Sequence, residues 1–463
     1  MITINYRIIF NLKGFIKMKK ILLINSPIYD RKVSDKEDYL PPYGLGYIAT
    51  ALESNYDVKI IDAVYNNYTV FELLEIIKTE QPDTVGINIF SVNFDLLKNL
   101  IEKCKVKTKF IVGGKSTRFL YPEIIKFNTP NEINVTIGEG EYITKDIIEG
   151  TVKENGIVKT NNRNVYLVNN NSKYFPVNLD VLKLNRKYFQ GRTILNNYGM
   201  MEEAIVTSRE CLYNCAFCGG ARSLNSDVLV RARSKENIKE ELEYIKQNNS
   251  ATESIRILDD LFLKNRQSII EAIEIFQSFS FKWRAMSHVL SLKGNSDLFK
   301  DLYISGCQEL EIGIESGSNN IRKMIHKAGT IEEVVEVIKQ VLDSGINVKG
   351  YVMYGILNET EEDALKTFAV VNELIEYSKN SRGKFRASAF QFRPYHGTEL
   401  YNKINSKISY QHNDNLDSLE GRNQFNFTAG NFSYCDTKLI EELVIKTNEL
   451  GEYQYVIRKS RKL

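Results

Sequence analysis

Short apolar runs alternate with helical stretches twice along the chain, and this alternation limits the folds open to it. In the first series the apolar runs lie at residues 20–27, 56–63, 83–90, 108–114 and 133–141. Helical stretches such as 45–54, 70–80 and 94–104 separate them. Strands that alternate with helices over short links form parallel sheets covered by helices. Residues 18–150 are therefore predicted to form a doubly wound parallel α/β sheet.

A second series of the same kind follows a polar, asparagine-rich segment at residues 151–200, which we expect to be a linker with one hairpin. Its apolar runs lie at residues 203–210, 254–260, 281–288, 309–316, 348–355 and 386–394. Helical stretches such as 234–248, 266–279 and 330–345 separate them. Six units of strand and helix predict a partly closed parallel barrel, a partial (β/α)6 barrel, over residues 201–400.

The chemistry of such barrels lies at the carboxyl ends of the strands. The residues that end the six expected strands are Cys211, Asp259 and Asp260, His288, Glu315 and Ser316, Gly355, and Arg393. Five of the six ends thus carry a thiol, a carboxyl group, an imidazole or a guanidinium group. A catalytic or binding site is expected there.

The two ends of the chain carry weaker signals. Residues 1–17 precede a natural opening at Met18, and we expect them to be an extension or a mis-set start without function. Residues 401–463 contain one amphipathic stretch at 437–450 and a basic end. This extension is expected to be a small cap or a packing element.

Composition excludes several classes of partner. The formal net charge is +3 over 463 residues, which gives no reason to expect nucleic acid or an anionic membrane as a partner. The apolar runs are of strand length and fall short of the roughly 20 residues that span a bilayer. The first residues lack the apolar core of a signal peptide. A cytoplasmic protein with reduced cysteines is expected.

Three of the six cysteines lie in the stretch "SRECLYNCAFCGG", spaced Cys-x3-Cys-x2-Cys as Cys211, Cys215 and Cys218. A closed structural zinc site takes four protein ligands, so zinc would need a distant histidine as its fourth ligand. Three thiolates on one loop can instead surround one corner of an iron–sulfur cube. The triplet alone leaves both alternatives open. The other cysteines are isolated and are expected to be small buried hydrophobes: Cys104, Cys307 and Cys435.

This loop, placed after the first strand of a βα barrel, resembles the signature of the radical SAM superfamily. In that superfamily three cysteines hold a 4Fe–4S cluster, and S-adenosylmethionine (SAM) chelates the open iron through its amino and carboxylate groups. Reductive cleavage of SAM then yields a 5′-deoxyadenosyl radical. The resemblance implies Cys211, Cys215 and Cys218 as cluster ligands, and an electron donor such as flavodoxin or ferredoxin as a partner.

Further segments carry the same resemblance. "ELEIGIESGSNNIRKMIHK" resembles the fourth-strand segment, whose end lies by the nucleoside of SAM. "YVMYGILNETEED" resembles the fifth-strand segment, although Leu357 and Asn358 replace the usual Pro-Gly. "ILDDLF" stands where many members have a glycine-rich end of the second strand. The resemblance implies a SAM site made of Phe217, Gly219, Asp259, Glu315, Ser316 and Gly355.

Ordinary structural roles compete with several of these assignments. Asp259 could be the N-cap of the following helix, and Glu315 could begin the next helix. His288 and His326 could be satisfied structural histidines rather than bases.

A substrate site is suggested by "RPYHGTELY" at the end of the sixth strand. Arg393, Tyr395 and His396 together suit an anionic substrate. A surface turn accounts for the same residues.

The first series resembles the Rossmann-like cobalamin-binding domain that precedes many radical SAM domains, through "PPYGLGYIATALES", "VKIIDA", "VGINIFS", "FIVGG" and "IGEGE". Ligands of such open sheets lie at the carboxyl ends of the strands. The candidate cobalamin residues there are Asn25, Ser26, Asp62, Ser91, Gly113, Gly114 and Glu139. The domain contains no histidine for cobalt, and the frequent "GGPH" reads "GGKS", with Lys115 and Ser116. A purely structural sheet is the alternative.

The resemblance as a whole implies a cobalamin-dependent radical SAM methyltransferase that acts on an unactivated carbon or a phosphinate of a small-molecule or peptide substrate. In that branch one SAM methylates cobalamin and a second gives the radical that removes hydrogen from the substrate. A non-methylating cyclase or rearrangement enzyme of the same branch is the first alternative. The alternative from another class is a zinc-stabilised binding module.

Overall fold

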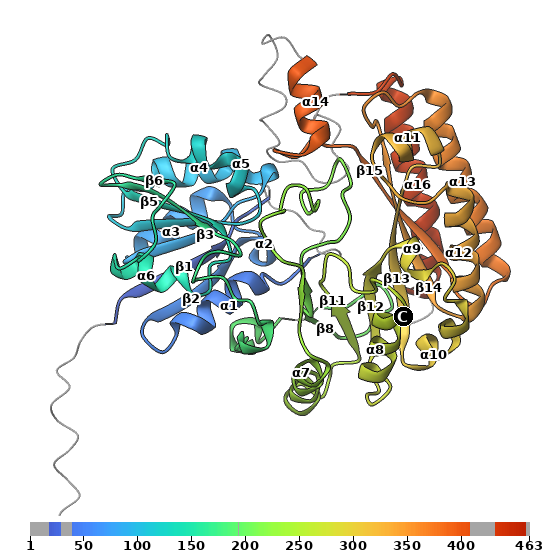
Figure 1. Ribbon diagram of the computed structural model, residues 1–463, viewed down its shortest axis with the longest axis horizontal. Coiled ribbons are helices and arrows are strands. Elements are labelled where there is room, and N and C mark those ends of the chain that lie inside the picture. Colours follow the sequence, from blue (N-terminus) through green and yellow to red (C-terminus); the bar gives the residue numbers. More distant parts are fainter. Residues whose placement is uncertain (1–17, 29–38, 193, 408–430, 460–463) are drawn as a thin grey trace, which may run out of the picture.

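The computed structural model describes residues 18–28, 39–192, 194–407 and 431–459. Two α/β domains lie side by side, the first in blue to teal and the second in green to red (Figure 1). The expected extension at residues 1–17 lies outside the described residues. No helix within the described ranges is both long enough and apolar enough to cross a bilayer.

The first domain is built on a seven-stranded sheet with the order β2-β1-β3-β4-β5-β7-β6. Its strands are β1 (Lys20–Asn25), β2 (Asp57–Asp62), β3 (Thr84–Asn88), β4 (Lys109–Gly113), β5 (Glu132–Gly138), β6 (Val158–Lys159) and β7 (Arg163–Val168). Every pairing is parallel except that of β6 with β7. The five strands predicted from the first apolar series are thereby confirmed.

Helices cover both faces of this sheet because its strands are apolar on both sides. They are α1 (Tyr43–Leu52), α2 (Ala63–Asn66), α3 (Val70–Glu80), α4 (Phe94–Lys103), α5 (Thr117–Ile124) and α6 (Ile143–Glu149), with a 3-10 turn at Ser91–Asn93. In β1, Leu22 and Ile24 pack in the cluster that includes α3, α4 and α5. Ile21 and Leu23 face the opposite cluster with α1 and α6. The predicted doubly wound arrangement is confirmed.

The segment expected to be a linker belongs to this sheet. Its predicted hairpin is present as β6 and β7, but β7 pairs in parallel with β5 along Ile133 to Gly138. The sheet of the first domain therefore continues past residue 150, into the segment expected to be a linker. The sequence predicts the hairpin but not its place in the sheet, because the parallel pairing of β7 with β5 depends on tertiary structure.

The second domain has the predicted six parallel strands, ordered β8-β11-β12-β13-β14-β15. They are β8 (Glu202–Ile205), β11 (Ser254–Ile257), β12 (Lys282–Ser287), β13 (Cys307–Glu315), β14 (Asn347–Tyr354) and β15 (Phe385–Gln391). A short antiparallel pair, β9 (Ser208–Arg209) and β10 (Arg231–Ala232), follows β8. The sheet forms the partial barrel that the second series predicted.

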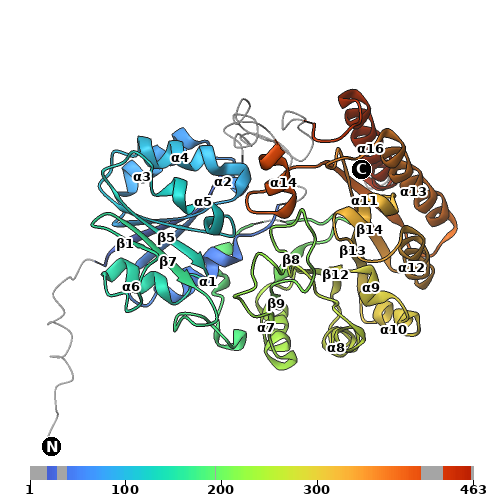
Figure 2. The same cartoon turned by 45° about the horizontal axis from the view of Figure 1, so that its top comes forward.

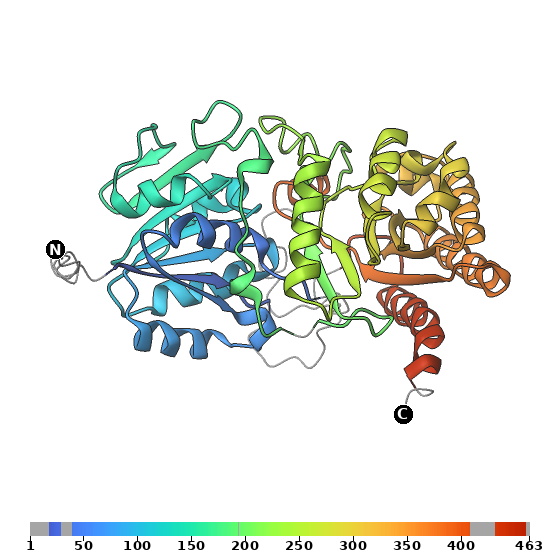
Figure 3. The same ribbon diagram turned by 90° about the horizontal axis from the view of Figure 1, so that it is seen from below.

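Most helices of this domain lie on the outside of the barrel. Its helices are α7 (Lys235–Asn248), α8 (Arg266–Phe276), α9 (Val289–Leu292), α10 (Phe299–Ile304), α11 (Asn319–Met324), α12 (Ile331–Ser344), α13 (Glu361–Asn380), α14 (Glu399–Lys407) and α16 (Thr437–Lys459). Further 3-10 turns lie at Leu179–Val181, Arg186–Phe189 and Ser296–Leu298. The C-terminal helix α16 packs beside β15 and buries Ile440, Leu443 and Val444 in the core of this domain (Figure 3). It is a packing element of the barrel.

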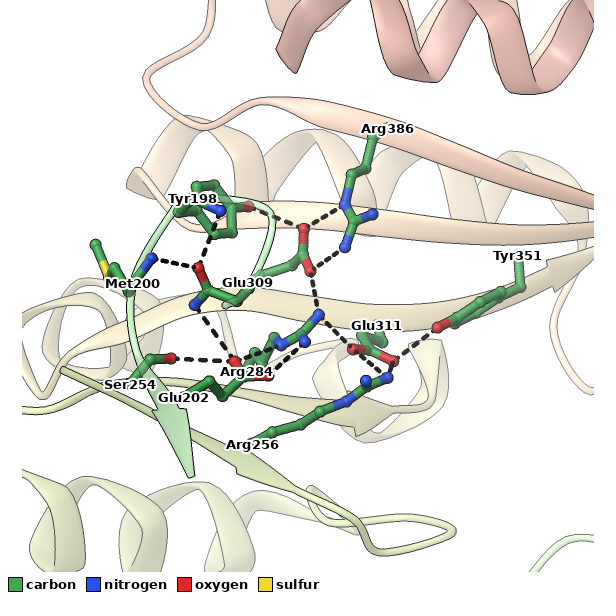
Figure 4. A network of polar contacts seen from close by, with 11 residues as sticks. Tyr198, Met200, Glu202, Ser254, Arg256, Arg284, Glu309, Glu311, Tyr351 and Arg386 are labelled. Atoms are coloured by element: carbon green, nitrogen blue, oxygen red, sulfur yellow. Dashed lines mark hydrogen bonds and ion pairs between the residues drawn. The ribbon is translucent and has the colours of Figure 1, made fainter. Parts of the chain in front are cut away.

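The inner face of the barrel is charged. In β13, Ile312 and Ile314 face the helices, whereas Glu309 and Glu311 point inward. Figure 4 shows how arginines from neighbouring strands meet these carboxylates. The ion pairs are Arg386–Glu309 at 2.7 Å, Arg284–Glu202 at 2.6 Å and Arg256–Glu311 at 3.3 Å. Glu202 and Arg386 lie at the amino ends of their strands, so this network fills the barrel at the end opposite the candidate site.

Candidate functional site

Cys211, Cys215 and Cys218 lie in the loop between β9 and β10, beyond the carboxyl end of the first barrel strand. All three side chains are partly exposed. The backbone N–H of Tyr213 points at Cys211 Sγ at 3.5 Å, and that of Gly220 at Cys218 Sγ at 3.3 Å. Hydrogen bonds to sulfur are among the interactions that set the potential of an iron–sulfur cluster. The loop therefore offers three thiols, and backbone donors already meet two of them, those of Cys211 and Cys218.

The donor set of this loop consists of three thiols. Among the described residues, no three His, Cys, Asp or Glu side chains are gathered closely enough to hold a metal ion as they stand. Burial raises the pKa of Cys215 to about 11 and also raises that of Cys218. A bound metal replaces such a proton outright. Three thiols without a fourth ligand suit a cluster with one open iron.

Lysine side chains surround the loop. The charge of Lys327 lowers the pKa of Cys215, and that of Lys115 lowers the pKa of Cys218, each against the larger effect of burial. Lys264 interacts electrostatically with Cys211 and donates a hydrogen bond to Ser208 Oγ at 2.8 Å. The Lys327 and Lys115 cations favour the thiolate forms of Cys215 and Cys218. Sequence reasoning named neither Lys264 nor Lys327, although Lys327 ends the segment quoted for the fourth strand.

Asp259 holds the start of the cysteine loop. Its carboxylate accepts hydrogen bonds from Thr207 N at 2.7 Å, Thr207 Oγ1 at 2.6 Å and Ser208 Oγ at 2.6 Å. The N-cap of α8 is Asn265, so the capping role considered for Asp259 is wrong. Burial raises the pKa of Asp259 while these hydrogen bonds lower it. Both of its oxygens are engaged, which makes it a support of the loop.

Glu315 ends β13 in a left-handed conformation, with φ of 66°. Its Oε1 lies 3.0 Å from Lys327 Nζ. A Cβ atom on Gly313 would lie only 2.1 Å from this oxygen, so glycine leaves the room for the pair. The following helix α11 begins at Asn319, and Glu315 is therefore not its first residue. Positive φ at a non-glycine residue marks strain of the kind that gathers at functional sites.

Of the remaining candidate SAM residues, two lie in turns after barrel strands and two lie on the cysteine loop. Ser316 is buried and accepts a hydrogen bond from Ser318 N at 3.1 Å, so it shapes the turn after β13. Gly355 has φ of 79° and donates its N–H to Glu359 at 2.6 Å. Phe217 packs on an apolar cluster with Ile325 and Phe392, whereas a Cβ atom on Gly219 would meet nothing within 4 Å. The loop therefore leaves open space beside Gly219.

The candidate cobalamin residues at the ends of β1 and β2 form a closed network. Asn25 Nδ2 donates to Asp62 Oδ1 at 2.8 Å, and Asp62 Oδ2 pairs with Arg192 at 2.8 Å. Ser26 donates both its N–H and its hydroxyl to Asn88, at 2.8 and 2.7 Å. Asp62 and Ser26 are buried, so they stabilise the edge of the sheet.

The end of β4 is different, because it is open. A Cβ atom on Gly113 would meet nothing within 4 Å, whereas one on Gly114, which has φ of 110°, would lie 2.5 Å from the carbonyl oxygen of Ile89. Ser91 Oγ and Ser116 Oγ lie 3.4 Å apart beside it. A backbone without side chains and two hydroxyl groups fit the approach of a flat ring such as cobalamin, and no histidine of this domain is available to cobalt.

The two candidate sites meet at the interface of the domains. Arg209, which precedes the cysteine loop, pairs with Glu139 at 2.6 Å and Glu141 at 2.7 Å. Lys115 from the end of β4 pairs with Asp260 from the end of β11 at 2.6 Å. Both unusual sequences, "GGKS" and "ILDDLF", thus contribute to one ion pair beside Cys218. Glu139 of the first domain therefore forms an ion pair with Arg209 of the second domain.

The candidate substrate residues lie at this interface too. His396 donates its backbone N–H to Ser91 Oγ at 3.3 Å, and Gly397 packs on Phe119 of α5 so closely that a Cβ atom would lie 2.3 Å from the ring. The segment is therefore not a surface turn. Arg393 is buried and Tyr395 is 39% exposed. The next element, α14, lies where the two domains meet (Figure 2), and Leu400 at its start donates to the carbonyl of Ala216 in the cysteine loop at 3.0 Å.

The two histidines near the site differ. His288 is buried at the end of β12 and caps α9. His326 is exposed and lies 3.4 Å from Glu399. His288 is the one that faces the cysteine loop, through Tyr213.

Comparison with known proteins gives a consistent result. Residues 205–371 match the radical SAM superfamily, and residues 34–148 match the B12 binding domain. An uncharacterised methyltransferase of Pyrococcus horikoshii is 28% identical over 408 residues, which cover 83% of each chain. The two matched families imply the cofactors, which are a 4Fe–4S cluster, SAM and cobalamin.

Solved structures agree on the fold. The cobalamin-dependent SAM radical enzyme OxsB, with aqua-cobalamin and SAM bound, superposes with a TM-score of 0.64 at 17% identity, over 88% of this chain and 64% of that chain. The chain thus spans about two thirds of the length of OxsB. The radical SAM methyltransferase TsrM from Kitasatospora setae, with cobalamin and a [4Fe–4S] cluster bound, gives 0.61 at 15% identity, over 84% and 75%. The chain belongs to the radical SAM superfamily, in the branch whose enzymes carry a cobalamin-binding domain.

Proposed function

We propose that the chain is a cobalamin-dependent radical SAM methyltransferase that acts on an unactivated carbon or a phosphinate of a small-molecule or peptide substrate. The observation that carries the proposal is the meeting of the cysteine loop with the open end of β4, joined by the ion pair of Lys115 and Asp260. The similarity to an uncharacterised methyltransferase of Pyrococcus horikoshii supports methyl transfer.

Cys211, Cys215 and Cys218 are proposed to hold the cluster, with the N–H groups of Tyr213 and Gly220 stabilising the charge on sulfur. When bound, the cluster, SAM and cobalamin supply the electron, the hydrogen-abstracting radical and the methyl group. The chain has to bind these groups, orient them and exclude water.

The SAM side is proposed to be formed by Phe217, Gly219, Glu315 and Gly355, with Asp259 and Ser316 holding the loops that carry them. The pair of Glu315 and Lys327 is buried, with side chains 10% and 9% exposed. A buried pair is rigid, which suits a residue that must fix the orientation of a nucleoside.

The cobalamin side is proposed to be the open end of β4, with Gly113, Gly114 and Ser91. Asn25, Ser26 and Asp62 support this edge from behind, and Glu139 ties it to the second domain. The substrate is proposed to reach the interface near Arg393, Tyr395 and His396. Arg393 would pair there with an anionic group.

The test is anaerobic purification and reconstitution followed by incubation with cobalamin and methyl-labelled SAM. Label should appear in cobalamin, and SAM should be cleaved to 5′-deoxyadenosine in the presence of a reductant such as reduced flavodoxin. The variant with Cys211, Cys215 and Cys218 all changed to Ala should lose iron, sulfide and cleavage. The matched control is Cys104→Ala, which changes a buried cysteine of the first domain. This variant should keep the iron, the sulfide and the cleavage of SAM.

Three outcomes would decide against parts of the proposal. A colourless protein with one zinc and neither iron nor sulfide would contradict the radical reaction. SAM cleavage without transfer of label would favour the cyclase or rearrangement enzyme. Failure to retain cobalamin would leave the first domain as a structural sheet.

A further inference from the structure

His288 has a fixed protonation pattern. It ends β12 and caps α9, where its Nδ1 accepts the N–H of Leu290 at 3.1 Å. A neutral imidazole that accepts at Nδ1 carries its proton at Nε2. Burial, with the charges of Lys327 and Arg322, lowers the pKa of His288 to about 3. The side chain is therefore a neutral N–H donor at any physiological pH.

This donor has no acceptor within the described part of the chain. The ring is only 5% exposed, and Nε2 is buried without a hydrogen-bond partner. Leaving a buried N–H group unpaired costs free energy, and folded proteins leave few such groups without a ligand or a water molecule. The acceptor is therefore expected to come from outside the described residues.

The position of the ring identifies the region that this acceptor occupies. His288 stacks on Tyr213, with ring centroids 3.9 Å apart and an angle of 21° between the planes. Tyr213 lies between Cys211 and Cys215, and its N–H meets Cys211 Sγ. The imidazole thus lies against the loop proposed to carry the cluster and SAM.

The electrostatic surroundings identify the chemistry of the acceptor. Two cations act on the ring, Arg322 and Lys327, and Lys327 also pairs with Glu315 at 3.0 Å. A positive surrounding disfavours an ammonium group and favours a carboxylate. In SAM the one anionic group is the carboxylate of its methionyl part.

We propose that Nε2–H of His288 donates a hydrogen bond to the carboxylate of SAM. This proposal rests on the proposed function, because it needs SAM to be bound at the cysteine loop. It adds a residue of the third strand to the SAM site, with the role of holding the methionyl end. No proton is transferred by the ring.

Two substitutions separate the two nitrogen atoms of the ring. In His288→Asn the side-chain oxygen can take the place of Nδ1 as the cap of α9, while the donor at Nε2 is lost. In His288→Gln an N–H donor remains near the position of Nε2, while the cap is weakened. The His288→Asn variant therefore tests the Nε2–H donor, and the His288→Gln variant is its matched control.

The ligands are S-adenosylhomocysteine, which keeps the carboxylate, and methylthioadenosine, which lacks it. Binding is measured by anaerobic calorimetry on the cluster-loaded full chain. His288→Asn should weaken the binding of S-adenosylhomocysteine by roughly tenfold or more, as expected for the loss of a hydrogen bond to a charged group. Binding of methylthioadenosine and the iron content should not change. The affinity of His288→Gln for S-adenosylhomocysteine should be closer to that of the wild type.

Wild-type affinity of His288→Asn for S-adenosylhomocysteine would overturn the proposal. Equal weakening of the binding of both ligands would overturn the proposal too, because the donor would then act on the nucleoside or on the shape of the site. A wild-type protein that holds no cluster or does not bind S-adenosylhomocysteine would instead refute the proposed function, and this proposal with it.

Discussion

Glu359 is a buried carboxyl group in the turn after β14. It is fully buried, its Oε2 accepts the N–H groups of Gly355 at 2.6 Å and Ile356 at 3.3 Å, and its Oε1 has no partner. Burial raises the pKa of Glu359 to about 8, although the two N–H donors lower it. The group is therefore protonated in the folded protein at neutral pH.

A raised pKa makes the folded protein less stable as pH increases. In the unfolded chain this carboxyl group has a pKa of about 4.3. Its contribution to stability is complete below that pH and is lost as pH rises through about 8. In between, the unfolding free energy should fall by up to roughly 1.4 kcal/mol per pH unit. Glu359→Gln should remove this slope.

The measurement is chemical denaturation of the wild type and of Glu359→Gln at pH 6 and pH 8. The stability difference between the two proteins should change in favour of the variant at the higher pH. A difference independent of pH would show that Glu359 is ionised in the folded protein.

Gly317 fixes the turn that follows Glu315 and Ser316. A Cβ atom there would lie 2.5 Å from the carbonyl oxygen of Lys366 and 2.7 Å from Thr367 Cα, both backbone atoms of α13. Backbone inside a packed helix cannot move aside easily, so Gly317→Ala should lower the unfolding free energy by about 1–3 kcal/mol. The control is Gly219→Ala, whose Cβ would meet nothing within 4 Å.

Thermal unfolding followed by circular dichroism compares the two alanine variants. Only Gly317→Ala should melt earlier than the wild type. Equal melting temperatures would mean that α13 gives way, and that Ser316 is not held against it.

Among the elements, β13 shows what its charged inner face does for stability. Glu309 is fully buried and receives Arg386 through two hydrogen bonds of 2.7 Å, and Tyr198 donates to it at 2.9 Å. Removing one partner of a buried pair leaves the other charge uncompensated. Glu309→Gln should therefore lower the unfolding free energy by about 3–5 kcal/mol.

An exposed pair provides the comparison. Glu376 and Lys379 on α13 lie 2.5 Å apart, with side chains 67% and 56% exposed. Glu376→Gln should change the unfolding free energy by less than about 1 kcal/mol. Denaturant unfolding of both variants tests the contrast, and similar losses would mean that water reaches the barrel interior.

The elements also show how far the sequence predicts this fold. The runs at 20–27 and 309–316 gave strands because their side chains alternate or are apolar throughout, and both are confirmed as β1 and β13. The hairpin of β6 and β7 was predicted as part of a linker, because its pairing with β5 depends on contacts that local sequence does not specify. Local sequence also predicted the cysteine loop. It did not predict Lys327, because the pair with Glu315 depends on how α11 returns toward the barrel.

At the scale of the whole molecule, Arg209 connects the two candidate sites. It stands two residues before Cys211, and it pairs with Glu139 and Glu141 in the turn after β5. Its side chain is 17% exposed and that of Glu141 is 5% exposed, so the contacts are largely shielded from water. Loss of the guanidinium group would leave a buried carboxylate without its partner, which costs about 3–5 kcal/mol.

Arg209→Met should therefore loosen both sides of the interface at once. Hydrogen exchange should increase in residues 132–141 of the first domain and in 208–220 of the second, and cobalamin should be lost more readily on gel filtration. The control is Arg266→Met, since the pair of Arg266 with Asp297 is half exposed on the outside of the barrel. That variant should exchange like the wild type in both segments. Faster exchange in 208–220 alone would mean that Arg209 supports only its own loop, and that the domains are held together by other contacts such as Lys115 with Asp260.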